Sequence, residues 1–376
     1  MRAARSRIAA EVLVAGAGVA FLGLAWWLRI DWLRRRFSLE RPFVFWLERG
    51  ALVAIAVALL VFVRPRVGAW AERVGAKEAA SAAARVAVAA VLAAIASEMG
   101  LRILGLPRRQ LTGETRTHLG ELDARYGWQF KASQSFEVPI GGRTVRYDFN
   151  ADHDRAHRAD EVPDLRAPSV IFAGESVTAG HGLAWDESLP AIVGEALHLQ
   201  VVDLGQEGYG SDQVFLRLHD ALPRFEHPVA VVTAFLPLMI GRVERDDHPR
   251  LRFEGDAISL GPPDFLQTSH LAQALRESFG FHREWALEET RDVLRRTAEL
   301  AEARGARAVF VAPHLQTYWP RTDDYFVDEL LTKQGFAVVN PRFGFEPIPG
   351  DTHPNAASTR RLAEAVVDAL RRELGR

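Results

Sequence analysis

The sequence predicts an α/β protein: a doubly wound sheet of five parallel strands, preceded by an N-terminal membrane anchor of about three transmembrane helices. From residue 165 onward, short apolar runs alternate with amphipathic stretches, as strands and helices alternate around a parallel sheet. Within residues 1–105, three long segments are almost free of charge. Charge separates the same two regions, because residues 1–110 hold 17 basic and 7 acidic side chains and the remainder holds 29 and 41.

The first predicted span, residues 8–28, has one charge, Glu11, and ends in Trp26 and Trp27. It is long enough to cross the roughly 30 Å apolar core of a bilayer, and tryptophans suit the headgroup region. The alternative is a cleaved signal peptide, but no pair of small residues follows the run to form a cleavage site. We therefore expect an uncleaved anchor.

The second and third predicted spans, residues 43–63 and 79–97, are less regular. The second contains an adjacent acid and base near one end and is closed by Arg64 and Arg66. The third is rich in alanine and contains Arg85, so that a surface amphipathic helix is the alternative. Basic residues flank both ends of the spans, and the positive-inside rule therefore does not decide the topology.

Five apolar runs of the second region are rich in Val, Ile or Phe and bounded by Gly, Pro or Asp, as buried parallel strands are. They are residues 169–173, 199–204, 229–235, 306–312 and 336–340. The helical stretches are residues 187–197, 211–222, 283–304, 325–334 and 356–374. Ser211-Asp212 and Asn355 are suitable N-caps for two of these helices. We assign residues 165–376 to one domain, whose ligand site is expected beyond the carboxyl ends of the strands.

Two segments do not follow this alternation. Residues 106–164 are polar, with a strand-like stretch at 142–149, and we expect a linker or cap. Residues 240–282 separate the third strand from the fourth without clear periodicity. An insertion of that length is typical of a lid or a binding loop.

The composition limits the possible chemistry. The chain has no cysteine, which excludes disulfides, thiol nucleophiles, cysteine zinc sites and iron–sulfur clusters. Its near-neutral charge is not that of a strongly basic nucleic-acid-binding protein, and we expect no nucleic-acid partner. A covalent mechanism would therefore need a hydroxyl nucleophile.

Three segments bring reactive groups to the predicted carboxyl edge of the sheet. Ser176 follows the first strand on a glycine-rich turn, where its N–H would point toward a developing anion; a plain helix N-cap serine is an equally simple interpretation. Glycines follow the second strand, either to let the backbone approach a ligand or only to turn the chain. Asp351 and His353 are two residues apart and point the same way in an extended turn, so that the carboxylate can set the imidazole tautomer.

In combination, these segments resemble the sequence blocks of the SGNH/GDSL hydrolase superfamily. Residues 174–180 resemble its first block, Gly-Asp-Ser-x-Thr-x-Gly, with Glu175 in place of the aspartate. Residues 203–211 resemble the second block, and residues 351–355 resemble the last. The blocks occur in the family's order, and the resemblance covers residues 165–376.

The resemblance implies a flavodoxin-like esterase fold, the SGNH hydrolase fold, and assigns a role to each matching residue. Ser176 would be the nucleophile, His353 the general base and acid, and Asp351 the orienting partner of His353. The backbone N–H groups of Ser176 and Gly208 would form the oxyanion hole. No metal site and no cofactor are implied.

The sequence departs from the family pattern in two places. Its acid and histidine follow the spacing Asp-x-His, which is similar to that of SGNH-like domains in alginate acetylation proteins, where much of the superfamily has Asp-x-x-His. The third block, Gly-x-Asn-Asp, should follow the third strand, but residues 235–242 contain no asparagine. One oxyanion donor is therefore missing or comes from elsewhere, for instance from the lid or His314. Loss of one such donor costs about 10²–10³ in rate.

The remaining candidates have simpler interpretations. His153 and His157 have the i, i+4 spacing of helical metal ligands, but charged neighbours indicate a solvated loop. We assign His181 a polar role in its loop. The run of three arginines at 34–36 suits a lipid-headgroup anchor.

The sequence thus predicts a membrane-anchored SGNH-type serine esterase or O-acyltransferase. By similarity to membrane-anchored bacterial SGNH proteins, we expect an inner-membrane protein with a periplasmic catalytic domain. The expected substrate is an ester, such as an O-acylated envelope glycan or lipid, and envelope-modification proteins are the expected partners. The alternative is a catalytically impaired SGNH module that serves in binding or assembly.

Overall fold

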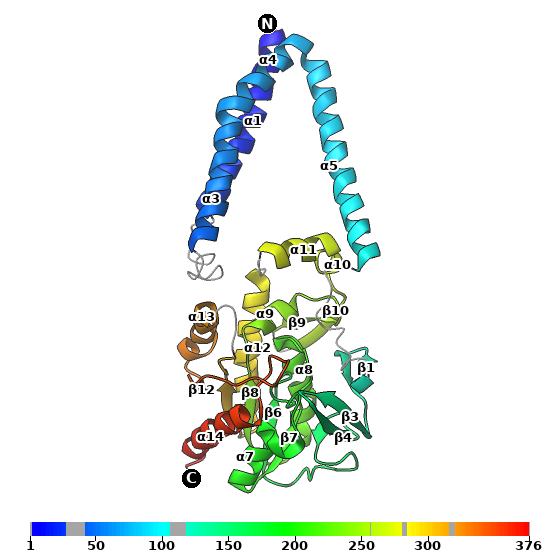
Figure 1. Cartoon of the computed structure of the whole chain (residues 1–376), viewed down its shortest axis with the longest axis vertical. Helices are drawn as coiled ribbons and strands as arrows, with labels where there is room; N and C mark the ends of the chain where they lie inside the picture. Colours follow the sequence, from blue (N-terminus) through cyan, green and yellow to red (C-terminus); the bar gives the residue numbers. More distant parts are fainter. Residues whose placement is uncertain are drawn as a thin grey trace. The chain divides into compact units, whose positions relative to one another are not determined.

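The computed structural model describes residues 2–27, 42–105, 118–255, 257–279, 284–315 and 320–375. The chain forms two compact units (Figure 1): the first contains residues 1–107 and 277–280, and the second contains residues 108–276 and 281–376. The arginine run at 34–36, Leu28 at the end of the first predicted span, and residues 106–117 of the predicted linker lie outside the described residues.

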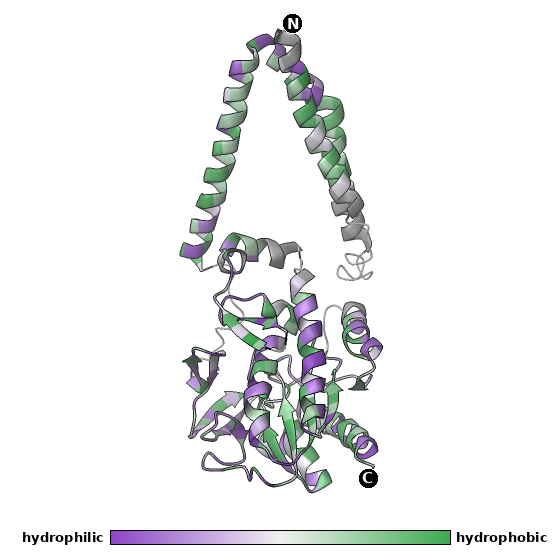
Figure 2. Cartoon of the chain, turned by 180° about the vertical axis from the view of Figure 1, so that it is seen from behind, coloured by the Kyte–Doolittle hydropathy of each residue, from purple (hydrophilic) through white to green (hydrophobic). Residues whose placement is uncertain are grey.

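The first unit is helical. Its helices are α1 (Arg2–Trp27), α3 (Pro42–Val57), the π-helical turn η1 (Ala58–Val63), α4 (Arg64–Val74) and α5 (Ala76–Leu104). Three of its segments are long and apolar enough to cross a membrane, namely Ser6–Gly23, Gly50–Val74 and Ala76–Leu104. Figure 2, coloured by hydropathy, shows hydrophobic residues in green along much of these helices. The second segment differs from expectation, since the helix continues as α4 through Arg64 and Arg66 instead of ending at them.

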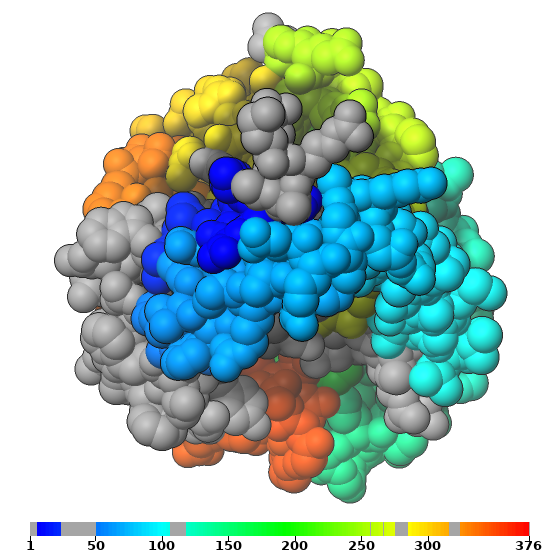
Figure 3. Space-filling model, turned by 90° about the horizontal axis from the view of Figure 1, so that it is seen from above, coloured from blue at the N-terminus to red at the C-terminus, as the bar shows by residue number. Residues whose placement is uncertain are grey.

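Ion pairs join α1 to α4 within this unit. Glu11 lies 2.9 Å from Arg7 of the same helix and 3.7 Å from Arg64 of α4. Arg7 also lies 3.1 Å from Glu72. In Figure 3, α1 (dark blue) lies beside the lighter blue residues of α3 and α4, with which it packs. Within the described part of this unit, no residue of α5 is buried.

The second unit is built on one eight-stranded sheet in the order β12-β11-β8-β6-β7-β5-β4-β3. The strands are β3 (Gln134–Ile140), β4 (Arg143–Phe149), β5 (Arg155–Ala156), β6 (Ser169–Ala173), β7 (Gln200–Asp203), β8 (Pro228–Ala234), β11 (Arg307–Val311) and β12 (Ala337–Val339). The five predicted strands are all present and parallel to one another. Their order is the flavodoxin-like one, with the chain reversing direction across the sheet between β6 and β8.

The prediction of a five-stranded, purely parallel sheet is wrong in its extent. Strands β3, β4 and β5 pair in antiparallel fashion and extend the sheet beyond β7. They come from the segment expected to be a linker or cap. The residues of β4 end in a buried run, Tyr147-Asp148-Phe149, because its inner end lies beside the parallel core and not in solvent.

Helices cover both faces of the sheet, as a doubly wound fold requires. They are α7 (Leu189–Leu197), α8 (Ser211–Ala221), α12 (Glu284–Ala303), α13 (Pro320–Leu330) and α14 (Ala356–Glu373). α7 packs with α14, and α8 packs with α12. Every residue of β6 is buried, which explains why its sequence is a continuous apolar run without alternation.

The predicted helix caps are half correct. The Asn355 side chain accepts a hydrogen bond from the Ser358 N–H at 2.9 Å and caps α14. α8 instead begins after Gly210. The side chains of Ser211 and Asp212 therefore have other partners, because tertiary contacts to Thr290 and His248 engage them.

The segment at 240–282 contains regular structure that the sequence pattern did not reveal. It consists of the end of α9 (Leu238–Val243), the hairpin of β9 (Arg250–Glu254) and β10 (Ala257–Gly261), α10 (Phe265–Thr268) and α11 (His270–Phe279). A second hairpin, β1 (Gly120–Asp123) with β2 (Gly127–Phe130), precedes β3. Short 3₁₀ turns are η2 (Trp185–Glu187), η3 (Leu222–Arg224) and η4 (Thr332–Gln334).

A buried arginine ties the added strands to the loop that follows β6. Arg155 of β5 lies opposite Asp203 of β7 and is 2% exposed. Its guanidinium donates to the backbone carbonyls of Ala179, Gly180 and Leu183. The guanidinium carbon also lies 4.5 Å from the centre of the Tyr147 ring, close enough for a cation–π contact. The antiparallel extension thus supports the residues just after Ser176.

Replacing Arg155 with methionine should destabilise the second unit. The substitution keeps much of the side-chain volume but leaves the carbonyls of Ala179 and Leu183 without a donor, whereas the Gly180 carbonyl still accepts the Leu183 N–H at 3.1 Å. We expect this loss to cost about 2 kcal/mol or more. Thermal and urea unfolding of the full chain in detergent would measure this loss. The control is Arg158→Met, which removes a side chain that is 68% exposed and should change stability by less than about 0.5 kcal/mol. Equal stability of the two variants would contradict the assigned role of Arg155.

Candidate active site

The turn after β6 presents Ser176 at the carboxyl edge of the sheet. Backbone hydrogen bonds close this turn: the Thr178 and Ala179 N–H groups donate to the Glu175 carbonyl at 3.0 Å, and the His181 N–H donates to the Ser176 carbonyl at 2.9 Å. Among the described residues, the Ser176 N–H has no acceptor. It is therefore available to a ligand.

The side chains of Ser176, His353 and Asp351 lie in one hydrogen-bonded row. Ser176 Oγ is 2.8 Å from His353 Nε2, and His353 Nδ1 is 2.5 Å from Asp351 Oδ1. The two-residue spacing allows this because the loop between β12 and α14 turns back on itself, with the Ile348 N–H donating to the His353 carbonyl at 2.9 Å. A row of this kind can move a proton from a hydroxyl to an imidazole while the carboxylate stabilises the imidazolium.

His181, to which the sequence assigned only a polar role in its loop, belongs to the same group of side chains. Its Nδ1 is 2.6 Å from Glu207 Oε1, and its Nε2 is 3.3 Å from Asp351 Oδ2. The rings of His181 and His353 lie 4.1 Å apart between centroids. Asp351 therefore has one imidazole at each of its two oxygens. The available signal was their position in the sequence: His181 directly follows the first matched block, residues 174–180, and Glu207 lies inside the second, residues 203–211.

The hydrogen bonds within this group stabilise the charged forms of His181 and Asp351. Burial lowers the pKa of His181, but its hydrogen bonds to Asp351 and Glu207 outweigh this effect and raise the pKa to about 10. Hydrogen bonds from His181 and from His353 hold the pKa of Asp351 well below its usual range, against the effect of burial. At neutral pH, His181 is therefore an imidazolium between two carboxylates.

Glu175, which replaces the family's aspartate, forms a second buried pair beside the serine. Its carboxylate accepts the Ser176 hydroxyl and, at 3.2 Å, the Arg242 guanidinium. Burial alone would raise the pKa of Glu175, but the charges of Arg242 and His353 and the hydrogen bond from Ser176 lower it below the usual value. An imidazole is ordinarily a stronger base than a carboxylate. His353 is therefore the better acceptor of the serine proton.

Two arginines, Arg242 and Arg245, bind the loop after β7 at Gly208 and at the residue that follows it. Arg242 donates to the Tyr209 carbonyl at 3.0 Å, and Arg245 donates to the Gly208 carbonyl at 3.4 Å. The Tyr209 hydroxyl donates to the Trp128 carbonyl at 2.5 Å. In the part of the chain that is described, the Gly208 N–H has no acceptor. Both N–H groups predicted for the oxyanion hole are thus free to donate.

Other residues considered from the sequence are engaged elsewhere. His314, considered as an oxyanion donor, lies 2.7 Å from Asp324 of α13. The segment after β8 contributes Arg242, which donates to Glu175 and to the Tyr209 carbonyl; the sequence held no signal for these contacts. His153 Nδ1 is 2.8 Å from the Phe130 carbonyl, and His157 is exposed in a loop.

One group of side chains has the spacing of metal ligands. Ligand atoms of His181, Asp351 and His353 lie within 4.8 Å of one another. The same atoms are hydrogen-bonded to each other, and His353 Nε2 faces Ser176. That arrangement is typical of a serine hydrolase triad, and a metal would have to replace the hydrogen bond between Asp351 and His353.

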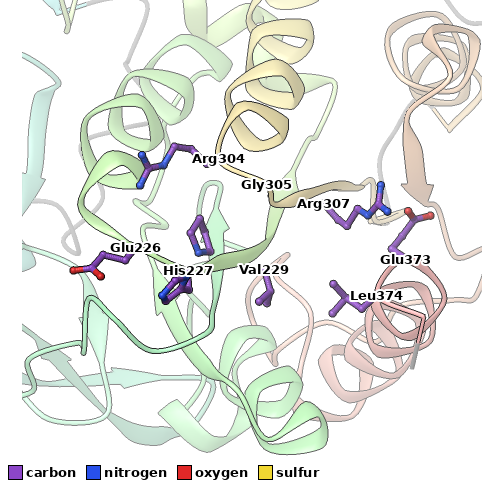
Figure 4. A pocket seen from close by; sticks show the side chains of 9 residues that line it. Glu226, His227, Val229, Arg304, Gly305, Arg307, Glu373 and Leu374 are labelled. Carbon is purple, nitrogen blue, oxygen red and sulfur yellow. The ribbon is translucent and has the colours of Figure 1, made fainter.

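A hollow of about 390 Å³ lies at the opposite edge of the sheet (Figure 4). It is lined by Val229 at the start of β8, Arg307 at the start of β11 and Glu373 at the end of α14, among others. Ligands of doubly wound folds bind beyond the carboxyl ends of the strands, whereas this hollow is at their amino ends. Arg304 in its wall also donates to the Phe225 carbonyl at 2.7 Å. We therefore place the candidate active site at Ser176.

We expect the stability of the second unit to fall as the pH rises from 7 to 10. Burial lowers the pKa of His248, but the charge and hydrogen bond of Asp212 and the contact with Asp247 raise it to about 10, and the pKa of His181 is also about 10. A folded pKa raised above the ordinary 6.5 gives stability that is complete below pH 6.5 and is lost as the pH rises through 10, at about 1.4 kcal/mol per pH unit and proton. Melting temperatures of the full chain, compared with those of His248→Gln, would measure this effect. The variant should show a flatter pH dependence, and an unchanged slope would contradict the assignment.

Of the three comparisons made with known proteins, only the comparison with solved structures found proteins similar to this chain. No family model matches the chain, and no curated protein matches it. The acetyl xylan esterase Est2A from the rumen bacterium Butyrivibrio proteoclasticus is similar over 57% of this chain and 66% of its own, at 14% identity and a TM-score of 0.34. A member of the lipolytic protein G-D-S-L family from Veillonella parvula is similar over 54% of this chain and 97% of its own, at 12% identity and a TM-score of 0.33. AlinE4, an SGNH-hydrolase family esterase, covers 57% of this chain with 98% of its own, at 18% identity and a TM-score of 0.28. At these identities and TM-scores, the similarity concerns the fold alone.

Proposed function

We propose that the chain is an SGNH-type serine hydrolase or O-acyltransferase, anchored in a membrane by its N-terminal helices, that acts on an ester. The observation that carries the proposal is the row of hydrogen bonds from Ser176 through His353 to Asp351, at 2.8 and 2.5 Å. The two free N–H groups, of Ser176 and Gly208, support it. Fold alone would not, because one fold hosts many functions.

The first half of the reaction forms an acyl-enzyme. Ser176 Oγ attacks the ester carbonyl while His353 Nε2 takes the hydroxyl proton, and Asp351 stabilises the imidazolium. The carbonyl oxygen becomes an oxyanion, to which the N–H groups of Ser176 and Gly208 donate. The tetrahedral intermediate then collapses, the ester C–O bond breaks, and His353 returns the proton to the departing alcohol.

The second half transfers the acyl group. Water or a sugar hydroxyl gives its proton to His353 and attacks the acyl carbon. Ser176 Oγ then leaves and regains the proton from His353. Water as acceptor makes the protein an esterase, and a sugar hydroxyl makes it an O-acyltransferase. Neither half needs a metal or a cofactor.

The substrate class follows from the anchor. The first unit has three helices of sufficient length and apolarity to span a bilayer, and we propose that residues 1–105 anchor the chain in a bacterial inner membrane. An enzyme held at that surface would meet O-acylated envelope glycans or lipids, and we propose a periplasmic position for the second unit, with envelope-modification proteins as partners.

A non-catalytic binding or assembly module is the second candidate function. The observation in its favour is the segment after β8, Phe235-Leu236-Pro237, which lacks the family's asparagine. With two oxyanion donors in place of three, we expect a rate lower by about 10²–10³ than that of a complete site. Low turnover would be consistent with either candidate, whereas covalent labelling of the serine separates them.

We expect a fluorophosphonate probe to label the full chain purified in detergent, and the chain to hydrolyse short-chain p-nitrophenyl esters. Ser176→Ala should abolish both, because it removes the nucleophile, and Asp351→Asn should reduce turnover by about 10⁴. Ser259→Ala, in hairpin strand β10, is the matched control and should keep wild-type labelling. Absence of labelling and of turnover in the folded wild type would refute the enzyme and favour the binding module.

A reporter fused to the C-terminus would test the topology. With the second unit in the periplasm, alkaline phosphatase joined after Arg376 should be active and green fluorescent protein at the same position should be dark. The opposite pair of results would place the domain in the cytoplasm and would remove envelope glycans from the proposed substrates.

A further inference from the structure

We propose that His181, held by Glu207, is a positioning residue that fixes the Asp351 carboxylate behind His353 and keeps His353 free to accept the serine proton. This inference rests on the proposed function and deepens it. The triad would then be the inner part of a longer row, in which a second imidazole and a second carboxylate follow Asp351. Three independent features of the structure support it.

The first feature is the backbone that carries His181. The two residues beside it are Gly180 and Gly182, at φ +65° and +72°, a conformation that favours glycine. A Cβ on Gly180 would lie 2.5 Å from Arg155 Nη1, and one on Gly182 would lie 2.4 Å from Ile348 Cδ1. The turn is therefore pressed between β5 and the loop that carries Asp351.

The second feature is the support beneath this turn. Buried Arg155 donates to the carbonyls of Ala179, Gly180 and Leu183, and the Gly182 N–H donates to the Tyr147 hydroxyl at 2.5 Å. Both supporting side chains come from strands outside the five-stranded core. A polar loop without a further role would not need a buried cation to hold it.

The third feature is the pair of contacts that His181 makes. Its two ring nitrogens face two carboxylates, Glu207 at 2.6 Å and Asp351 at 3.3 Å. Carboxylates accept hydrogen bonds and do not donate them, so both nitrogens must carry a proton. His181 is thus a fixed cation, 8% exposed, which takes one oxygen of Asp351 and leaves the other to His353.

Such a cation should act on His353 in two ways. It prevents rotation of the Asp351 carboxylate, so that Oδ1 stays aligned with His353 Nδ1. It also places a fixed positive charge beside the ring that takes up the serine proton in the proposed reaction, at 4.1 Å between ring centroids, and like charges at that distance repel. The titratable groups that contact the His181 ring are Glu207, Asp351 and His353. Tyr147 and Arg155 contact the backbone of the two glycines beside it.

The test compares His181→Gln and His181→Ala with the wild-type full chain in detergent. Glutamine keeps a hydrogen-bond donor toward Asp351 but removes the positive charge. Alanine removes both the donor and the charge. We expect kcat to fall by about tenfold or more in the alanine variant, with partial recovery in the glutamine variant and KM nearly unchanged. In both variants, the acidic limb of the kcat/KM profile should move to higher pH, because the cation beside His353 is gone.

His248→Gln is the matched control. His248 is also a buried histidine between two carboxylates, Asp212 and Asp247, each at 2.8 Å, but it does not touch the triad. If His181 served stability alone, its variants would behave like this control: a lower melting temperature and a pH profile with the same midpoint. An acidic limb unchanged in both His181 variants would overturn the proposal.

A readout without turnover separates this inference from the proposed function. In ¹⁵N-histidine NMR spectra, the pH at which the His353 ring signals shift should be higher in His181→Gln than in the wild type. This measurement decides the proposal even if the wild type neither labels nor turns over, an outcome that would refute the enzyme alone. An unchanged His353 titration would refute the positioning role. One equivalent of Zn²⁺ bound by the wild type and lost in His181→Ala would assign these side chains to a metal site and overturn it as well.

Discussion

The Asp351 carboxylate is the acceptor on which the arrangement of the site depends. Its two oxygens face two imidazoles, His353 and His181, which come from loops after different strands of the sheet. Through His181 the contact extends to Glu207 in a third loop. A carboxylate has enough lone pairs to accept from both rings at once. One side chain therefore sets the mutual position of the loops after β6, β7 and β12.

Each of the two buried carboxylates near Ser176 is paired with a positively charged side chain. Glu175 and Glu207 are both buried carboxylates, and each has its own cation, Arg242 or the His181 imidazolium. Unpaired buried charges would be costly, and unpaired carboxylates would also compete with His353 for the serine proton. Pairing lowers the basicity of Glu175, so that the imidazole remains the base. The same pairing makes the site sensitive to the loss of any one cation.

The antiparallel strands β3, β4 and β5 belong to the function of the site as much as to the sheet. Arg155 and Tyr147 reach from them under the turn that carries His181. A buried cation without a carboxylate partner is stabilised here by carbonyl oxygens and an aromatic ring, at the expense of hydration. Burial lowers the pKa of Arg155 accordingly. The position of the loop after Ser176 thus depends on residues far before it in the chain.

The sequence by itself determined what depends on local pattern: the long apolar segments of residues 1–105, the five parallel strands, the Asn355 cap and the pairing of Asp351 with His353. Buried parallel strands are continuous apolar runs, and a two-residue spacing suffices to bring an acid to its histidine. Only the tertiary structure decided the antiparallel extension, the partner of Glu175 and the place of His181. Those features depend on contacts such as Arg242 to Glu175 and Asp351 to His181. Contacts between residues far apart in the chain leave no period or spacing in the sequence, because they arise only when strand order brings separate loops to one edge of the sheet.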